Sequence, residues 1–301
     1  VGLVEEDEAF DYELLEPSTA SSYLSMIKVH IRPRWENVPL SEVKPAKVEA
    51  WLKSINREPK TKGHLKELMH RLFEKAMLWE LLPFERNPMD LVTIKGVSKR
   101  SKKPIVLTVE QCLILISFLP EPYRTMVIVA ICTGLRVSEI LAMRWSRIDF
   151  EKLTMTVKVK VVNGRIGRVK TEYSEDELPL DPEFAAVLLA WKKRCPDSPG
   201  DWVFPSPFTD RCYHASPIQQ DYIRPAGKKL GLESVGWHTF RHTYRTWLDA
   251  TGAPVGVQQK LLRHADIGTT MKYGNALMES KRDANSKVVR MARPLLQQAH
   301  A

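Results

Sequence analysis

Four residues between positions 237 and 273 have the types and the spacing for phosphate chemistry. His238 and Arg241 are three residues apart, so on a helix the imidazole and the guanidinium would share one face. Further along come His264 and, nine residues later, Tyr273. Arginine binds phosphate oxygens in pairs, histidine moves protons, and tyrosine can attack as a covalent nucleophile. Together these side chains predict a site that acts on a phosphate ester.

Each of these residues also has an ordinary structural explanation when it is taken alone. A tyrosine in an amphipathic segment is usually a half-buried packing residue, and a His-x-x-Arg pair on a helix usually faces solvent. His242 shares the helix face with His238, and we expect it to pack in the protein. No carboxylate cluster for a metal accompanies these residues in the sequence, and there is no P-loop. We therefore expect no metal and no nucleotide or other cofactor.

Composition predicts a globular protein of more than one domain. The chain has 301 residues, of which 44% are hydrophobic and 27% are charged. No apolar run approaches the ~18 residues of a membrane span, and the first ten residues do not form a secretory signal. The four cysteines show neither a CxxC pair nor zinc spacing, which favours a reducing cytoplasm. Because the chain begins with Val1 and not Met, we expect it to be processed or truncated.

The distribution of charge indicates a polyanionic partner. The net charge of +9 is unevenly distributed, since residues 1–20 carry seven acidic and no basic side chains. Residues 21–107 carry 18 basic and 9 acidic side chains, and residues 108–301 carry 27 and 20. Neutralisation of phosphates by Lys and Arg drives binding to nucleic acids. The charge therefore indicates a polyanion such as a nucleic acid, and by itself it does not identify which one.

The first half of the chain predicts a helical domain behind an acidic leader. Residues 1–18 lack periodicity, and the apolar stripe that follows stops before Pro33. Further helices are expected from Pro45 and from Pro59, with a short element at Asn87–Pro88. Residues 19–94 are thus predicted to form an all-α domain. The segment 95–106 is a basic linker, either a solvated tether or a strap across a phosphate backbone, with the candidate contacts Lys99, Arg100, Lys102 and Lys103.

The second half predicts a mainly helical domain with one small antiparallel sheet. Thr108-x-x-Gln111 is a capping box that opens a helix, and a later helix is expected to end near Trp145. Alternation in residues 155–162 and the Asn163–Gly164 turn predict a β-ribbon, and Leu178–Leu180 an edge strand. Helices are then expected at 181–193, at 216–230, from 237, and after Pro254. The fold class is accordingly mainly α, of the α+β type.

Four sequence segments together resemble the successive motifs of the tyrosine recombinases, the phage-integrase family. They are TGLRVSEILAMRW (133–145), VKTEYSEDELPL with Lys170, HTFRHT (238–243) and LLRHADIGTTMKY (261–273). The resemblance covers residues 107–275 closely, and residues 19–94 more loosely resemble the core-binding domain of that family. It implies a site-specific recombinase or integrase whose partner is double-stranded DNA and which needs neither metal nor ATP.

The resemblance implies a role for each matching residue. Arg136 and Arg241 would bind the non-bridging oxygens of one DNA phosphate, and Tyr273 would attack the phosphorus to give a 3′-phosphotyrosyl link. His238 and His264 would hydrogen-bond the phosphate and assist proton movement. Lys170 would protonate the leaving 5′-oxygen. Glu139, about one turn beyond Arg136, would not touch the DNA but would hold the part of the site that contains the arginine.

Some assignments within the resemblance stay open. Lys158 and Lys160 also lie on the ribbon and compete with Lys170 for the role of the acid. Arg263 stands where the family usually has glycine. This departure leaves the local backbone conformation around His264 open. The family implies a homotetramer on two DNA sites, with a monomer or dimer off DNA. Residues 276–301 are then either a helix exchanged with a neighbouring subunit or a tail packed on their own chain.

Two other functions remain to be weighed against recombination. The same cut-and-reseal chemistry would serve type IB topoisomerase-like relaxation of DNA, and a catalytically inactive DNA-binding module would keep the fold alone. The separate helical domain favours a recombinase over a topoisomerase, and the presence of every candidate catalytic residue disfavours an inactive module. Location in the cytoplasm, on the nucleoid when bound to DNA, is expected.

Overall fold

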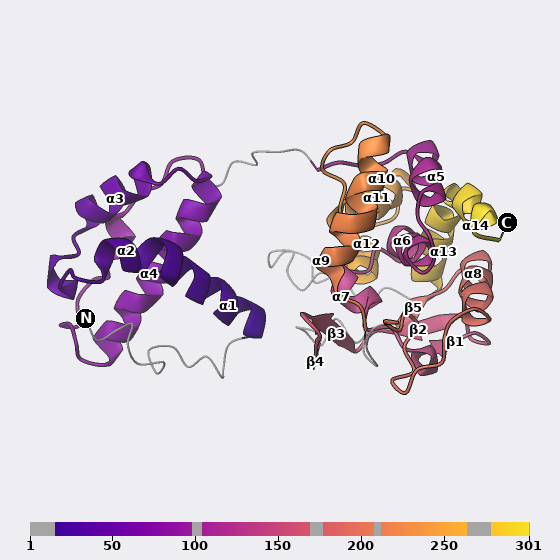
Figure 1. The fold of residues 1–301 in the computed structure, drawn as a ribbon, viewed down its shortest axis with the longest axis horizontal. Coiled ribbons are helices and arrows are strands. Elements are labelled where there is room, and N and C mark those ends of the chain that lie inside the picture. The colour runs from indigo at the N-terminus through magenta and orange to yellow at the C-terminus, as the bar shows by residue number, and fades with distance from the viewer. Residues whose placement is uncertain (1–15, 98–103, 169–176, 208–211, 264–277, 301) are drawn as a thin grey trace. The chain divides into compact units, whose positions relative to one another are not determined.

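The chain forms two compact units, Val1–Lys103 and Pro104–Ala301 (Figure 1). Both are built largely of helices, and short antiparallel strands occur in the second, so the prediction of a mainly helical α+β fold is confirmed. None of the helices in the described ranges combines the length and the hydropathy that a membrane span requires. The computed structural model describes residues 16–97, 104–168, 177–207, 212–263 and 278–300.

The first unit is a helical domain whose helices begin at prolines. Pro17, Pro45 and Pro59 each occupy the start of a helix, where the missing N–H costs no hydrogen bond. The core includes the edge-to-face pair Trp35 and Trp51, whose ring centroids are 5.6 Å apart. The elements are α1 (Pro17–Met26), η2 (Ile27–Ile31), α2 (Arg32–Trp35), η3 (Leu40–Glu42), α3 (Pro45–Ser54), α4 (Pro59–Leu78) and η4 (Pro88–Leu91).

Two prolines are accommodated inside continuous helical paths by π-helical turns. The apolar stripe stops before Pro33, yet the helical path continues through it into α2, directly after the π turn η2. The π turn η7 (Gln219–Ile223) precedes Pro225 in the same way. Inside an α-helix the proline ring clashes with the carbonyl four residues earlier, and the wider turn relieves that clash.

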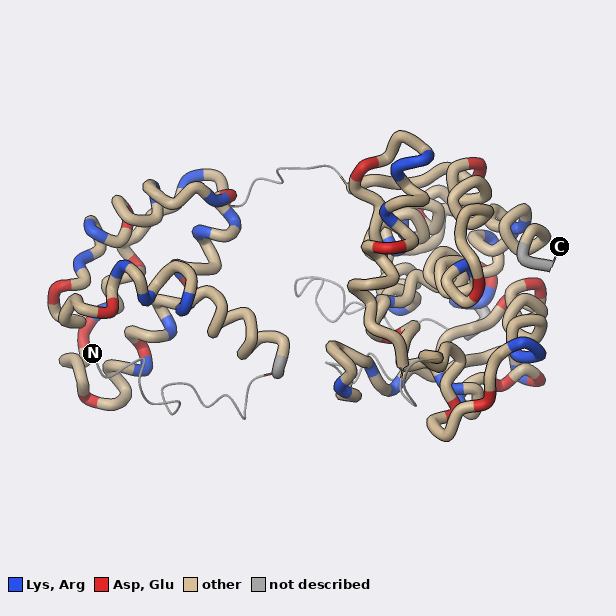
Figure 2. Tube along the Cα trace, viewed as in Figure 1, with Lys and Arg blue, Asp and Glu red and all other residues tan. Residues whose placement is uncertain are grey.

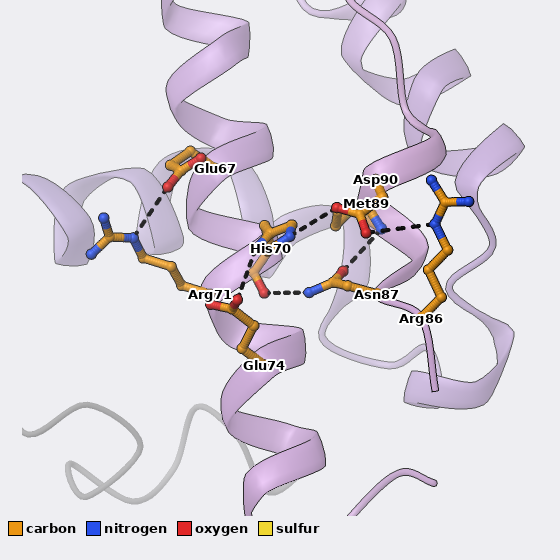
Figure 3. Close-up of polar contacts among 8 residues, drawn as sticks. All are labelled: Glu67, His70, Arg71, Glu74, Arg86, Asn87, Met89 and Asp90. Carbon is orange, nitrogen blue, oxygen red and sulfur yellow. Dashed lines mark hydrogen bonds and ion pairs between the residues drawn. The ribbon is translucent and has the colours of Figure 1, made fainter. Parts of the chain in front are cut away.

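A polar cluster fixes the short turn η4 to the middle of α4 (Figure 3). The Nδ2 of Asn87 donates to the carbonyl of His70 at 2.9 Å, and its Oδ1 accepts from the N–H of Met89 at 3.0 Å. The Nε2 of His70 lies 3.0 Å from Oδ1 of Asp90. Asn87 is buried, so these bonds satisfy a side chain that would otherwise be costly inside the domain.

The second unit has one main core, and its central helices are α6 (Tyr123–Thr133) and α11 (Trp237–Ala250), which pack on each other (Figure 1). The predicted capping box is confirmed, because Thr108 Oγ1 accepts from the N–H of Gln111 and Gln111 Oε1 accepts from the N–H of Thr108. The other helical elements are α5 (Val109–Ser117), α7 (Val137–Ile140), η5 (Trp145–Arg147), α8 (Pro182–Lys192), α9 (Ala215–Ile218), α10 (Arg224–Lys229), α12 (Val255–Leu262), α13 (Met278–Met291) and α14 (Arg293–His300).

The described strands form two small antiparallel sheets where the sequence predicts one. The first has the order β1 (Ile148–Asp149), β2 (Thr154–Thr156), β5 (Glu177–Pro179). The second is the hairpin β3 (Val159–Val162) and β4 (Arg165–Arg168), which turns at Asn163–Gly164 as expected. The alternating run is therefore divided between β2 and β3. Pro179 lies on an edge strand, where its missing N–H is tolerated.

The helix expected to end near Trp145 is wrong in its length, because α7 ends at Ile140. Beyond it the chain makes backbone bonds to a segment far along the sequence: the N–H of Trp145 donates to the carbonyl of Asp201, and the N–H of Val203 donates to the carbonyl of Met143. Arg144 and Trp202 form the bridge between these segments. Residues 143–145, whose sequence pattern alone favours a helix, therefore pair with residues 201–203 instead.

The C-terminal helices pack on their own domain in this single chain. α13 lies against α11 and α12, and α14 lies against α5 and α8. Tyr244 on α11 donates its phenol proton to Oδ1 of Asn285 on α13 at 2.9 Å. Val288, Val289 and Leu295 are fully buried. Exchange of these helices between subunits stays a prediction.

Candidate active site

Arg136 stands at the N-terminal end of α7, where a tight turn leaves α6. The turn passes through Gly134, which has a φ of +65° and lies against the ring of Tyr244. The backbone N–H of Arg136 donates to Oε2 of Glu139 at 2.8 Å, and its Nη1 donates to Oε1 of the same carboxylate at 3.1 Å. Its side chain remains 38% exposed. Glu139 therefore holds the arginine, and part of the guanidinium reaches the surface.

Arg241 is held in the interior by two backbone carbonyls. Its Nη1 donates to the carbonyl of Gly134, and its Nη2 donates to the carbonyl of Leu262. The residue is only 9% exposed. One guanidinium thus connects α11 to the turn before Arg136 and to the end of α12, so its position is set by three separate segments.

Arg136 lies close enough to Arg241 for its charge to affect the pKa of Arg241. Burial lowers the pKa of Arg241 to about 10, and the positive charge of Arg136 is the next largest cause. The carboxylate of Glu139 opposes this shift, and Arg263 adds to it. A pKa of about 10 still leaves Arg241 protonated at neutral pH. The fold therefore assembles neighbouring cations from helices far apart in the sequence, as an anion site requires.

Arg263 joins this site, which the sequence did not indicate. It follows the last residue of α12 with a φ of +51°, the left-handed conformation. Its side chain is 1% exposed, and its Nη2 lies 2.6 Å from Oε1 of Glu139, which is 4% exposed. The departure from the family's glycine was the one signal in the sequence, but nothing local connects that position to Glu139.

His238 lies in the first turn of α11 and is exposed. The start of this helix is fixed by the N–H of Trp237, which donates to Oε1 of Gln219 at 3.1 Å, and by the N–H of Gly236, which donates to Oγ1 of Thr239 at 3.1 Å. The predicted helix is confirmed, so His238 and Arg241 lie one turn apart. The shared helix, and not a direct bond, relates the imidazole to the arginine. His242 is half-buried, which agrees with a packing role.

The remaining predicted site residues lie outside the described residues. These are Lys170, His264, Tyr273, and the linker residues Lys99, Arg100, Lys102 and Lys103. The described chain stops at Arg263, directly before His264, and resumes at Met278. It likewise stops at Arg168 and resumes at Glu177, on either side of Lys170. The assignments of these residues stay predictions.

A basic cavity lies next to the arginine cluster, between α7 and the strands β2 and β3. Its volume is about 160 Å³. Arg144 lies with its guanidinium carbon 4.6 Å from the ring centroid of Trp202, while Arg147 and Lys158 are exposed. The lining residues are Glu139, Ala142, Met143, Arg144, Arg147, Thr156, Val157, Lys158 and Val159. Three cations against one carboxylate favour an anionic occupant, such as a phosphate group.

Comparison with known sequences gives a family match over more than half of the chain. The family model described as "Phage integrase family" matches residues 106–280. A tyrosine recombinase of Pseudothermotoga lettingae is 25% identical over 91% of this chain and 93% of its own length. The tyrosine recombinase XerA of Pyrococcus furiosus is 29% identical over 60% of each chain.

Comparison with solved structures shows the same fold. The Tn1549 transposon integrase, solved in complex with a circular intermediate DNA, superposes with a TM-score of 0.74 at 19% identity, over 91% of this chain and 95% of its own. A lambda integrase dimer bound to a core site superposes with a TM-score of 0.65 at 17% identity, over 84% and 87%. At these identities the structural likeness concerns the fold alone.

Proposed function

Because the chain belongs to the phage integrase family, we propose that the arginine cluster is the phosphate-binding half of a site-specific DNA recombinase whose nucleophile is Tyr273. The enzyme is a tyrosine-type recombinase, as its relatives are. The observation that carries the proposal is the bond from the Nη1 of Arg241 on α11 to the carbonyl of Gly134, two residues before Arg136 at the start of α7, which brings the two arginines to one place.

The two guanidiniums would bind the non-bridging oxygens of the phosphate that is cut. The Arg136 side chain is partly exposed, and the buried guanidinium of Arg241 has an orientation fixed by two backbone carbonyls. The five-coordinate transition state carries more negative charge than the ground state, so preorganised cations stabilise it preferentially. Loss of one such donor costs about 3–4 kcal/mol, or roughly 10²–10³ in rate.

The chemical step consumes no cofactor. The Oη of Tyr273 attacks phosphorus while its proton leaves toward His238 or His264, because a phenol with a pKa of ~10 is scarcely ionised at neutral pH. The bond from phosphorus to the 5′-oxygen breaks, and Lys170 donates the proton that this oxygen takes. The products are a 3′-phosphotyrosyl ester and a free 5′-hydroxyl. Attack by the 5′-hydroxyl of a second strand reverses these events, so ATP is unnecessary.

Double-stranded DNA is the proposed partner. Structural neighbours were solved with DNA, and Lys and Arg recur along both units of this chain (Figure 2). The helical unit would bind the duplex with the catalytic unit, and Lys99, Arg100, Lys102 and Lys103 would lie along the backbone. We further propose a homotetramer on two DNA sites, a monomer or dimer off DNA, and a cytoplasmic, nucleoid-associated location.

The test is covalent capture on a nicked substrate. A duplex carrying the recombination site, recovered from the junctions that flank the encoding element, is nicked on the 3′ side of the cleavage position. Cleavage then releases a short fragment with the free 5′-hydroxyl, which diffuses away and cannot reverse the reaction. Wild-type protein should then accumulate a protein–DNA adduct that survives SDS, and Tyr273→Phe should form none. Adduct formation by Tyr273→Phe at the wild-type rate would overturn the proposal.

Arg136→Ala separates binding from chemistry. It should bind the duplex nearly as wild type, because most affinity comes from many phosphate contacts, but form adduct about 10²–10³ times more slowly. Equal loss of binding and cleavage would contradict the role assigned to Arg136. Relaxation of plasmids that lack the site would instead favour a topoisomerase, and binding without any adduct would favour an inactive module.

A further inference from the structure

Arg263 is more deeply buried than either arginine that we assign to the substrate. Its side chain is 1% exposed, and its guanidinium reaches Oε1 of Glu139 at 2.6 Å. The same carboxylate oxygen accepts from Nη1 of Arg136 at 3.1 Å. One oxygen therefore lies between two guanidiniums that come from opposite ends of the domain sequence.

Arg263 has a backbone conformation that favours glycine, so the presence of an arginine side chain there needs an explanation. It follows α12 in the left-handed conformation, with a φ of +51°. An L-residue carries an energetic penalty there that glycine avoids, and glycine is the common residue at helix ends of this geometry. The side chain must therefore contribute something that the backbone alone does not require. Its contact with Glu139 is the contribution that the structure shows.

The charges of Glu139 and its two arginine partners indicate what the side chain of Arg263 contributes to the site. Without Arg263, Arg136 would be the one guanidinium that the described residues place in direct contact with the buried carboxylate of Glu139, which would then offset more of the charge of Arg136. With Arg263 in place, the carboxylate is already paired, so the four groups Arg136, Arg241, Arg263 and Glu139 retain a net charge of about +2. The influence of Arg263 on the pKa of Arg241 shows that these charges lie within reach of one another.

We propose that Arg263 is a positioning residue that neutralises Glu139 and so leaves the charge of Arg136 available to the substrate phosphate. Glu139 still orients Arg136 through the backbone N–H at 2.8 Å, while its other oxygen is shared, closer to Nη2 of Arg263 at 2.6 Å than to Nη1 of Arg136 at 3.1 Å. Arg263 also fixes the end of α12, whose Leu262 carbonyl accepts from Arg241, immediately before His264. This role rests on the proposed recombinase function.

The test compares Arg263→Gly, Glu139→Gln and the double variant. Glycine adopts the left-handed conformation without a steric penalty, so Arg263→Gly does not strain the turn. A loss of activity in this variant is therefore due to the missing side chain. It should form the covalent adduct about 10- to 100-fold more slowly than wild type, with DNA affinity within about threefold. Adding Glu139→Gln should recover about tenfold of that loss, since the unpaired carboxylate that restrains Arg136 is removed.

Arg263→Lys serves as the charge-preserving control and should keep more activity than Arg263→Gly. Melting curves of all variants confirm that the domain is folded, and if Arg263→Gly does not fold, Arg263→Lys and the neutral double variant carry the comparison. Adduct formation by Arg263→Gly at the wild-type rate, or a double variant no faster than Arg263→Gly, would overturn this inference alone. Wild-type protein that forms no adduct would instead overturn the proposed function.

Discussion

At the residue scale, the two arginines assigned to the phosphate are held in different ways. Arg241 is buried and uses its N–H groups on the carbonyls of Gly134 and Leu262, whereas Arg136 is 38% exposed and is restrained by Glu139. Arg241 is therefore both a part of the framework and a charge. Arg136 is the cation that can meet a ligand at the surface.

Replacement of each arginine by lysine should separate these roles. Arg241→Lys cannot reach both carbonyls at once and leaves one of them buried without a donor. We expect the free energy of unfolding to fall by about 1–3 kcal/mol. Arg136→Lys can keep an ion pair with the buried carboxylate of Glu139 and has a partly exposed side chain, so it should change stability by less than about 1 kcal/mol. Urea denaturation of both variants tests this, and equal stability losses would contradict the difference in roles.

At the scale of elements, α11 and the turn between α6 and α7 form the site together. The fully buried Tyr244 of α11 fills the space beside Gly134, and burial raises the pKa of its phenol. A Cβ on Gly134 would lie 2.3 Å from a ring carbon of Tyr244. The carbonyl of Gly134 is also the acceptor for Arg241. Helix packing and arginine placement therefore depend on one glycine.

Gly134→Ala should be strongly destabilising. It combines the penalty of a left-handed φ with a clash against a buried ring, so we expect a loss of about 2–4 kcal/mol in unfolding free energy. Gly231→Ala is the matched control, because Gly231 has a φ of +71° but no heavy atom within 4 Å of its Cβ position. It should cost only about 1 kcal/mol. Thermal and urea unfolding measure both, and equal losses would show that the contact with Tyr244 is unimportant.

The sequence predicted those elements whose signals are local. Prolines at helix starts, the Thr108–Gln111 capping box and the Asn163–Gly164 turn each act through neighbouring residues, and each appears in the structure. The length of α7 was missed because residues 143–145 bond to residues 201–203. The path through Pro33 was missed because a π turn carries no recognisable pattern.

The candidate site shows the same division between local and distant signals. His238 and Arg241 were correctly placed on one helix, because their spacing is a property of α11 alone. The meeting of Arg136 with Arg241 followed only from a family resemblance, since they lie on different helices. The contact of Arg263 with Glu139 depends on where α12 ends in space. No pattern of neighbouring residues encodes that position.

At the scale of the whole molecule, excess positive charge is shared by both units, and the second unit concentrates some of it near the site. Arg147 and Lys158 are exposed at the cavity beside Glu139. Arg293 on α14 is instead paired with Glu183 at 3.0 Å. Arg147 and Lys158 should therefore contact DNA, while Arg293 of α14, which is already paired with Glu183 of α8, should not.

The salt dependence of DNA binding tests this distribution. Each phosphate contact contributes about 0.9 to the slope of log affinity against log salt concentration. Arg147→Ala and Lys158→Ala should each reduce that slope by about 1, whereas Arg293→Ala should leave it unchanged. Titrations of a fluorescent duplex at several salt concentrations measure the slopes. The same slope in all three variants would contradict a DNA contact at the cavity.

The most direct test of the central claim is to identify the residue that becomes joined to DNA. The adduct formed on a nicked duplex is digested with nuclease and trypsin, and the modified peptide is sequenced by mass spectrometry. Because Tyr273 follows Lys272, the account predicts a nucleotide-bearing peptide of residues 273–281, YGNALMESK, with the phosphate on its tyrosine. A nucleotide attached to any other side chain would contradict it.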